Sequence, residues 1–220
     1  MNYYISDPHF DYVPILEQAQ RPFSSISEMN ETLIDNWNRT VSDSDTVYLL
    51  GDLCGHGLPI PEDHLSRLKG KKHLIRGNHD TGLDNPWLLF QYFETVTDFL
   101  EIEDNGVHVV LCHYPIVYLQ SGYMIHGHMH GAKQEAYHIL KPLSRVMNAS
   151  ADIHHFCPVT LEELISDNQI FYETPGRGQL DDQPLRKKSK WAPDFRPLPQ
   201  KQTSPKVLNI MQTRLGGNEK

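Results

Sequence analysis

Short apolar segments recur along this chain, and several of them end directly in aspartate, glycine or histidine. Asn2–Ile5 is followed by Ser6-Asp7, and Thr46–Leu50 is followed by Gly51-Asp52. Short apolar runs that are bounded by turn-forming residues are typical of buried β-strands. The chain therefore predicts a sheet framework whose strand ends carry polar side chains.

Helical patterns alternate with these strands in the first half of the chain. Ser25-x-x-Glu28 is a capping-box pattern, and apolar residues recur at helical spacing from Ile26 to Val41. Pro61–Leu68 and Pro86–Phe93 are also predicted helices, because proline is favoured in the first helical turn. A last helix is expected over Pro158–Ile165, with Thr160 as its N-terminal cap.

Strands dominate the second half. Val96–Ile102 and Val107–Cys112 flank an Asn-Gly pair, which predicts a β-hairpin. Further strands are predicted at Tyr123–Ile125 and Val146–Ile153. Early alternation of helices and strands, followed by strands, predicts an α/β fold in which two mixed β-sheets pack as a sandwich flanked by helices.

The charge and composition change near residue 174. The segment 174–220 has ten basic and four acidic residues, whereas the rest of the chain has a net charge of −14. We therefore predict one domain over residues 1–174 and a basic, Pro-rich, extended or disordered tail over 175–220. The acidic body argues against a nucleic-acid partner and suits a protein that concentrates cations.

The sequence gives no sign of a membrane partner. No apolar run approaches the roughly 18 residues that a membrane span needs, and Met1–Ser6 lacks the pattern of a signal peptide. The three cysteines, at 54, 112 and 157, have no CxxC spacing, which argues against a disulfide framework. A cytoplasmic location is expected, and the oligomeric state stays open.

Five polar motifs follow one another, and each lies where a predicted strand ends. In open α/β sheets the ends of the strands form the ligand-binding edge, so these motifs are expected to converge. Each motif alone is weak evidence, but the ordered set is specific. The motifs are Asp7-Pro8-His9, Gly51-Asp52, Gly77-Asn78-His79-Asp80, His113, and Gly127-His128-Met129-His130.

These residue types favour a metal site. Imidazole nitrogens and carboxylate oxygens suit divalent Mn, Fe, Co, Ni and Zn. Asp7-x-His9 and His128-x-His130 can each supply two ligands, because alternate residues of an extended segment point the same way. Two ions beside Asp7 and Asp52 would leave a net charge of about +2, which suits a phosphate and a hydroxide. A site of this kind predicts hydrolysis of a phosphate ester, with His79 free to act as general acid.

The five motifs resemble those of the calcineurin-like metallophosphoesterase superfamily. The resemblance extends through about Asn2–Ile165 and is closest to small bacterial and phage members, which share patterns such as His113-Tyr114-Pro115. It implies a sandwich of two mixed sheets and a dinuclear metal centre, with manganese the preferred metal. The protein Ser/Thr phosphatase branch is disfavoured, because no Asp-Arg-Gly follows Gly51-Asp52 and Asp80 replaces a glutamate.

The resemblance also implies residue roles. His79 would be the general acid, oriented by Asp80, and Asp52 would bridge the two metals. One metal would be held by Asp7, His9, Asp52 and His130, and the other by Asp52, Asn78, His113 and His128.

Substrate contacts are less specific. Arg21 and Arg76 are predicted to bind phosphate, because guanidinium groups match its oxygens, although Arg76 could equally be structural. The substrate would be a phosphorylated small molecule or a nucleotide-type ester, either a phosphomonoester or a phosphodiester. Two alternatives stay open: a non-catalytic binding or scaffold protein on the same fold, and a nuclease aided by the basic tail.

Overall fold

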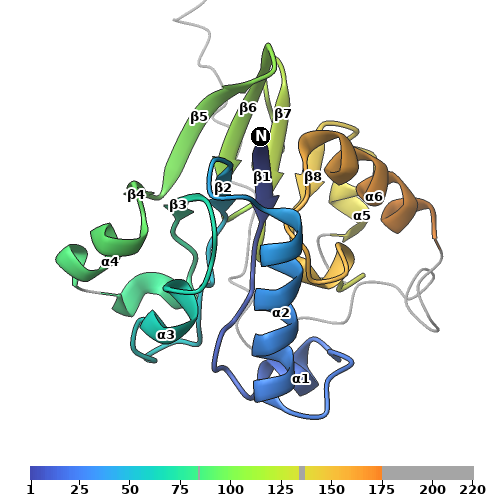
Figure 1. Ribbon diagram of the computed structural model, residues 1–220. Coiled ribbons are helices and arrows are strands. Elements are labelled where there is room, and N and C mark those ends of the chain that lie inside the picture. The colour runs from blue at the N-terminus through green and yellow to red at the C-terminus, as the bar shows by residue number, and fades with distance from the viewer. Residues whose placement is uncertain (84, 134–136, 175–220) are drawn as a thin grey trace, which may run out of the picture. The chain divides into compact units, whose positions relative to one another are not determined.

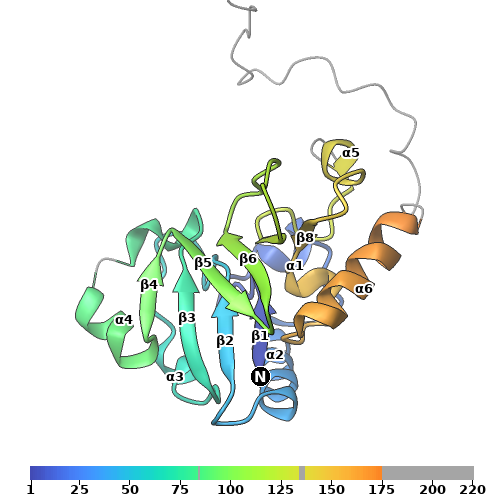
Figure 2. The ribbon, with the colours of Figure 1, turned by 90° about the horizontal axis from the view of Figure 1, so that it is seen from above.

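The computed structural model describes residues 1–83, 85–133 and 137–174, whose strands form two four-stranded sheets (Figures 1 and 2). The predicted tail over 175–220 lies outside the described residues, so the domain boundary at 174 stays a prediction. Among the described residues, no helix combines the length and the apolar character that crossing a membrane requires.

The first sheet has the strand order β1-β2-β3-β4, and neighbouring strands run parallel. Figure 2 shows the arrows of these strands pointing the same way, so that their carboxyl ends share one edge. An antiparallel bridge between Tyr4 and Val159 adds to the outer side of β1. The strands are β1 (Asn2–Ile5), β2 (Thr46–Leu49), β3 (Lys71–Ile75) and β4 (Thr95–Thr97).

The second sheet has the order β5-β6-β7-β8 and is mixed. The predicted hairpin is confirmed: β5 and β6 pair antiparallel across Asn105 and Gly106, whose φ angles are 50° and 81°. β6, β7 and β8 then run parallel. The strands are β5 (Phe99–Asp104), β6 (Val107–Cys112), β7 (Tyr123–His126) and β8 (Val146–Asn148).

Helices flank the sheets, and side chains cap the two longest ones. Ser25 accepts a hydrogen bond from the Glu28 amide at the start of α2, and Thr160 and Glu163 form a complete capping box at α6. α6 contacts β8 and β1 (Figure 1). The helices are α1 (Ile15–Gln18), α2 (Ile26–Thr40), α3 (Glu62–Leu65), α4 (Pro86–Tyr92), α5 (Tyr137–Leu140) and α6 (Leu161–Glu173), with 3₁₀ turns η1 (His79–Gly82) and η2 (Ala151–Ile153).

Two predicted strands were too long. The predicted strand 96–102 breaks at Asp98, so that β4 belongs to the first sheet and β5 to the second. The predicted strand 146–153 ends at Asn148 and continues as a bridge at Ser150 and the turn η2. In both cases apolar residues continue past the end of the strand, and periodicity alone does not reveal the change of partner.

Alternate residues of each strand face different apolar layers, which confirms the sandwich. Tyr3 and Ile5 pack with helix α2, whereas Tyr4 packs in a layer that also contains Leu111 and Ile125 of the second sheet. Val110 faces a third layer, on the far side of the second sheet. This period-two alternation buries both faces of β1, β2, β3, β6, β7 and β8, whereas alternate residues of β5 are exposed. It gives the strand ends a rigid base.

The two sheets are also joined at their carboxyl ends. Ser6, just after β1, pairs in parallel with Ser150, just after β8. The Ser6 amide donates to the Ala149 carbonyl at 2.8 Å, and the Ala151 amide donates to the Ser6 carbonyl at 3.0 Å. The loops that follow the strands of both sheets are therefore brought to one place.

We expect Ile125→Ala to reduce the free energy of unfolding by about 2–5 kcal/mol, because Ile125 is fully buried between the sheets and truncation leaves a cavity. Ile170→Ala is the matched control, since Ile170 is 60% exposed on α6 and should change stability by about 0.5 kcal/mol or less. Urea unfolding measures both; equal losses would contradict the layered core.

Candidate metal centre

The motif loops of both sheets meet in two groups of side chains that could hold metal ions. Within each group the potential ligand atoms lie within 4.8 Å of one another. These groups draw on loops after β1, β2, β6 and β7, so residues from both sheets converge as the sequence predicted. The first group is Asp7, His9 and His130, and the second is Asp52, His113 and His128.

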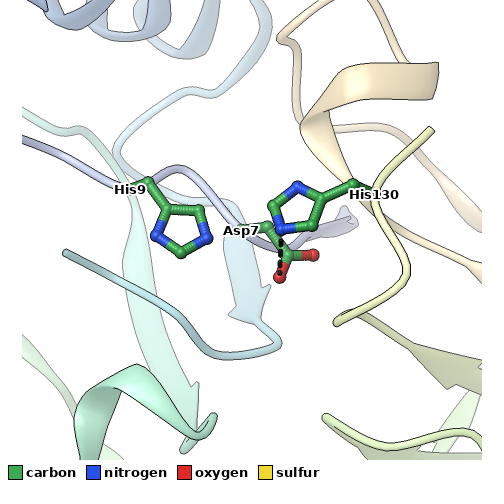
Figure 3. A group of neighbouring side chains, drawn as sticks. All are labelled: Asp7, His9 and His130. Atoms are coloured by element: carbon green, nitrogen blue, oxygen red, sulfur yellow. Dashed lines mark ion pairs between the residues drawn. The ribbon is translucent and has the colours of Figure 1, made fainter. Parts of the chain in front are cut away.

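The first group lies where the loops after β1 and β7 meet (Figure 3). Asp7, His9 and His130 all have positive φ angles, of 55°, 54° and 48°. Non-glycine residues rarely adopt this strained conformation, and it is common at functional sites. The Asp7 carboxylate also accepts hydrogen bonds from the Ser6 hydroxyl at 2.6 Å and from the His128 amide at 3.1 Å. These contacts fix its direction toward His130 Nε2, which is 4.0 Å away.

His9 carries the clearest sign of a metal. Its side chain is 1% exposed, and neither of its ring nitrogens has a hydrogen-bond partner among the described residues. Burial lowers the pKa of His9 to about 3, so the ring is neutral at physiological pH and keeps a free lone pair. A buried imidazole without partners is costly unless something else satisfies it, and a metal ion does so.

The second group has its ligand atoms oriented by hydrogen bonds. His113 Nδ1 lies 2.8 Å from the Leu50 carbonyl, which can only accept, so Nδ1 carries the proton and Nε2 the lone pair. That Nε2 lies 3.0 Å from Asn78 Oδ1, and His128 Nδ1 lies 2.8 Å from the same oxygen. Asn78 therefore lies with the second group, as its sequence position predicted.

Asp52 lies between the two groups. Its Oδ2 is 3.6 Å from His9 Nε2 in the first group, and its Oδ1 is 3.6 Å from His113 Nε2 in the second. One carboxylate thus offers a separate oxygen to each group. This arrangement suits a bridging ligand between two cations.

The electrostatics of the centre also fit cations. Burial, with the negative charge of Asp7 adding to it, raises the pKa of Asp52. Burial works against a charged His130, but the carboxylates of Asp7 and Asp152 outweigh it and raise the pKa of that ring. A raised pKa means that the surroundings, including the nearby negative charge, favour a bound proton. A metal ion can take the place of that proton, because metal binding deprotonates its ligands. The donor set, the unpartnered His9 and the shared Asp52 therefore fit two divalent ions.

Gly77 allows the loops to approach closely. A Cβ atom at this position would lie 2.3 Å from Asp52 Oδ1 and 2.7 Å from the Asp52 amide. Real Cβ atoms do not come this close to such atoms, so any larger residue must displace the Asp52 carboxylate.

The role expected for Asp80 needs correction. Its buried carboxylate accepts hydrogen bonds from the amides of Asp52, Leu53 and Gly77, at 2.8 to 2.9 Å, and no hydrogen bond to the His79 ring is present among the described residues. The His79 ring is oriented instead by the His56 amide, which donates to Nδ1 at 3.0 Å. Asp80 therefore holds backbone in place, and the sequence missed the backbone donor because it lies 23 residues from His79.

The phosphate contact expected for Arg21 is also wrong. Its side chain is fully buried, and the guanidinium donates to the Asp152 carboxylate, to the Asp7 and Pro8 carbonyls and to the Met29 sulfur. These bonds leave no donor for a substrate. Arg76 is exposed and forms a two-point ion pair with Asp98, at 2.8 and 2.9 Å. A phosphate contact of Arg76 stays a prediction.

Asp152 was missed by the sequence analysis. It follows β8, and its Oδ2 lies 2.8 Å from His130 Nδ1. The signal was available, because an acidic residue after a strand end is the pattern of the other motifs. The predicted strand over 146–153 concealed it by placing Asp152 within a strand.

Comparison with known proteins gives relatives for this chain. The uncharacterized protein MJ1445 of Methanocaldococcus jannaschii is 36% identical over 168 residues, which are 74% of this chain and 88% of that protein. The crystal structure of AQ665, a protein of unknown function from Aquifex aeolicus, aligns with a TM-score of 0.61 at 24% identity, over 76% of this chain and 98% of that one. A phosphoesterase of Escherichia coli, Yfce, aligns at 15% identity over 68% of this chain and 77% of its own, with a TM-score of only 0.37. No family model matches the sequence.

The two sheets carry their ordered motifs at one shared edge, where two groups of potential metal-ligating side chains meet. At 36% identity over most of both chains, this protein belongs to the same family as MJ1445 of M. jannaschii.

We expect Gly77→Ala to weaken divalent metal binding about tenfold or more, because the added methyl displaces Asp52, which lies between the two candidate groups. Gly131→Ala is the control, since a Cβ there would meet its nearest neighbour, Asp152 Cβ, at an ordinary 3.7 Å. Isothermal titration of the metal-free proteins measures the affinities. Unchanged binding in Gly77→Ala would contradict the shared role of Asp52.

Proposed function

We propose that the chain is a metal-dependent phosphoesterase that hydrolyses phosphomonoesters or phosphodiesters at a dinuclear metal centre. The observation that carries the proposal is the position of Asp52, which presents one oxygen to each of two groups of metal-ligating side chains. Two cations sharing a bridging ligand are suited to an in-line displacement at phosphorus, where charge develops on both the attacking and the leaving oxygen.

We assign the donor side chains to two ions that share Asp52. Asp7, His9, Asp52 and His130 would hold the first ion, and Asp52, Asn78, His113 and His128 the second. When bound, the ions would neutralise phosphate charge and lower the pKa of water, which makes a nucleophile available near neutral pH. Manganese is the preferred ion, and the same nitrogen and oxygen donors accommodate Fe, Co, Ni or Zn.

His79 would act as the general acid. Its ring centroid lies 5.0 Å from that of His9, at the edge of the first group, and the side chain is half-buried. The His56 amide donates to Nδ1, which orients the neutral ring and leaves its one proton on Nε2. To act as an acid, the ring would first take up a second proton at Nδ1 in exchange for that contact. The imidazolium would then give its Nε2 proton to the leaving oxygen as the phosphorus–oxygen bond breaks, and the ring would end neutral.

The acid and the bridging carboxylate share one support. The His79 amide donates to Asp52 Oδ1 at 2.8 Å, and the Asp52 amide donates to the Asp80 carboxylate at 2.8 Å. These hydrogen bonds join the loop that carries the general acid to the loop that carries the shared ligand, through two buried carboxylates. Pre-organisation of this kind lowers the cost of reaching the transition state.

Aromatic side chains border the proposed centre. The ring centroids of Tyr12 and His79 are 5.5 Å apart, and those of the half-exposed Tyr114 and of His128 are 4.8 Å apart. Aromatic faces suit a nucleobase or another flat leaving group, which supports a nucleotide-type ester beside a small phosphorylated metabolite. The acidic charge of residues 1–173 disfavours the nuclease alternative.

A scaffold protein would have no need for the unpartnered His9. Without selection for catalysis, a buried imidazole that lacks hydrogen bonds would be destabilising and would favour replacement by an apolar residue. This chain nevertheless keeps His9, which is 1% exposed and lies beside Asp7. The intact His9 therefore supports the enzyme over the non-catalytic alternative.

We expect the metal-free protein to be inactive on bis-p-nitrophenyl phosphate and p-nitrophenyl phosphate, and added Mn²⁺ to restore hydrolysis. Asn78→Ala should lose that activity, because it removes a ligand oxygen of the second group. The better substrate distinguishes a diesterase from a monoesterase. Full metal binding without hydrolysis of either ester would favour the scaffold alternative, and no metal binding at all would refute the proposal.

We expect His79→Ala to bind metal normally and to lose about 10²- to 10⁴-fold in kcat on an alkyl phosphate, whose leaving oxygen needs a proton. The loss should be much smaller on the p-nitrophenyl ester, because p-nitrophenolate leaves without protonation. Steady-state kinetics on both esters make the comparison, with His56→Ala as control, since alanine keeps the amide that orients the ring. Equal losses on the two esters would argue against a general acid.

A further inference from the structure

A buried ion pair lies behind the first group of ligands. Arg21 Nε and Nη2 donate to the two Asp152 oxygens at 2.9 and 3.0 Å. The Arg21 side chain is fully buried and that of Asp152 is 7% exposed. The pair is therefore joined at two points and isolated from solvent.

Asp152 fixes the ring of one ligand. Its Oδ2 accepts from His130 Nδ1 at 2.8 Å and from the Ser150 hydroxyl at 2.9 Å. Because the carboxylate accepts a hydrogen bond from Nδ1 of His130, the ring proton lies on Nδ1. The lone pair is then on Nε2, which faces Asp7. Carboxylate partners of this kind also make the imidazole a stronger ligand.

Arg21 fixes the backbone of the other two ligands. Its Nη2 donates to the Asp7 carbonyl at 2.6 Å, and its Nη1 donates to the Pro8 carbonyl at 2.8 Å. Asp7 and His9 need positive φ angles to turn toward the ion, and these bonds offset the cost of that strained conformation. One guanidinium thus connects the loop after β1 to the loop after β8.

The second group is supported by other contacts. The Leu50 carbonyl orients His113, and the Asp80 carboxylate holds the amides of Asp52 and Gly77. No hydrogen bond from Arg21 or Asp152 reaches His113, His128 or Asn78 among the described residues. Arg21 and Asp152 therefore bond directly to the first group alone, and the two groups are linked through the shared Asp52 and the bond from the His128 amide to Asp7.

We propose that Arg21 and Asp152 are positioning residues that build the first metal site alone, so that the two metal sites are separable by mutation. The inference rests on the proposed dinuclear function and adds that the two ions depend on different buried carboxylates. Asp152 selects the ligating nitrogen of His130, and Arg21 holds Asp7 and His9 in place. Without the pair, the second ion would still bind.

The test is metal binding by the full chain. Wild type, Asp152→Asn and Asp152→Ala are stripped with a chelator and titrated with Mn²⁺, and the number of bound ions is measured by elemental analysis. Electron paramagnetic resonance distinguishes an exchange-coupled pair from an isolated ion. We expect two coupled ions in wild type. Both variants should retain one isolated ion, with the affinity for the other lowered about 10- to 100-fold.

Asp104→Asn is the matched control. Asp104 is also a buried carboxylate, 4% exposed, and it accepts from the Tyr4 hydroxyl at 2.8 Å and from the Asn2 amide group at 3.1 Å. It should lower the melting temperature and still bind two coupled ions, because it contacts neither group. Ser150→Ala removes one bond to Asp152 and provides a milder variant if the others fold poorly, with a smaller loss at the same ion.

The outcomes are distinct. Two coupled ions with unchanged affinity in the Asp152 and Ser150 variants would overturn the inference and leave the proposed function intact. Loss of both ions together in these variants, with Asp104→Asn unaffected, would overturn the separability of the sites. A wild-type chain that binds fewer than two ions would overturn the proposed function itself.

Discussion

The pairing of the two sheets at their carboxyl ends is the constraint on which the rest of this structure depends. Ser6 and Ser150 bridge the loops after β1 and β8, and the amides of Ser6 and Ala151 complete that bridge. Because parallel strands all end at one edge, joining two such edges brings loops from both sheets within ligand distance of one another. The apolar layer between the sheets resists any shear that would separate them.

Polar groups buried at this junction are satisfied almost completely, and the exceptions are informative. Arg21 and Asp80 form several hydrogen bonds to backbone atoms of the ligand loops. Asp152 accepts from the side chains of Arg21, His130 and Ser150. The His9 ring has no hydrogen bond among the described residues. Since buried polar groups are rarely left unpaired, the unpaired ring identifies where a cation belongs more directly than the surrounding charge does.

The loops that carry the ligands are held by charged side chains that do not contact the proposed substrate. A carboxylate or guanidinium that accepts or donates several bonds within a dry interior is rigid, and it transmits that rigidity to the atoms it contacts. Asp80 does this for the loops after β2 and β3, and Arg21 does it for the loop after β1. Buried charge in this protein therefore serves geometry, which explains why so many acidic residues near the centre are not ligands.

The sequence by itself determined the helix caps, the ends of the strands that carry the five motifs and the identities of the side chains that meet, because these depend on local periodicity and on residue chemistry. Asp7, His9, Asp52 and Asn78 could be named without coordinates for that reason. Only the tertiary structure decided which charges face the centre and which support it. Arg21 and Asp152 lie 131 residues apart, and their pairing depends on how the sheets join. The orientation of His79 by the His56 amide was equally hidden, since a backbone donor has no residue type to recognise.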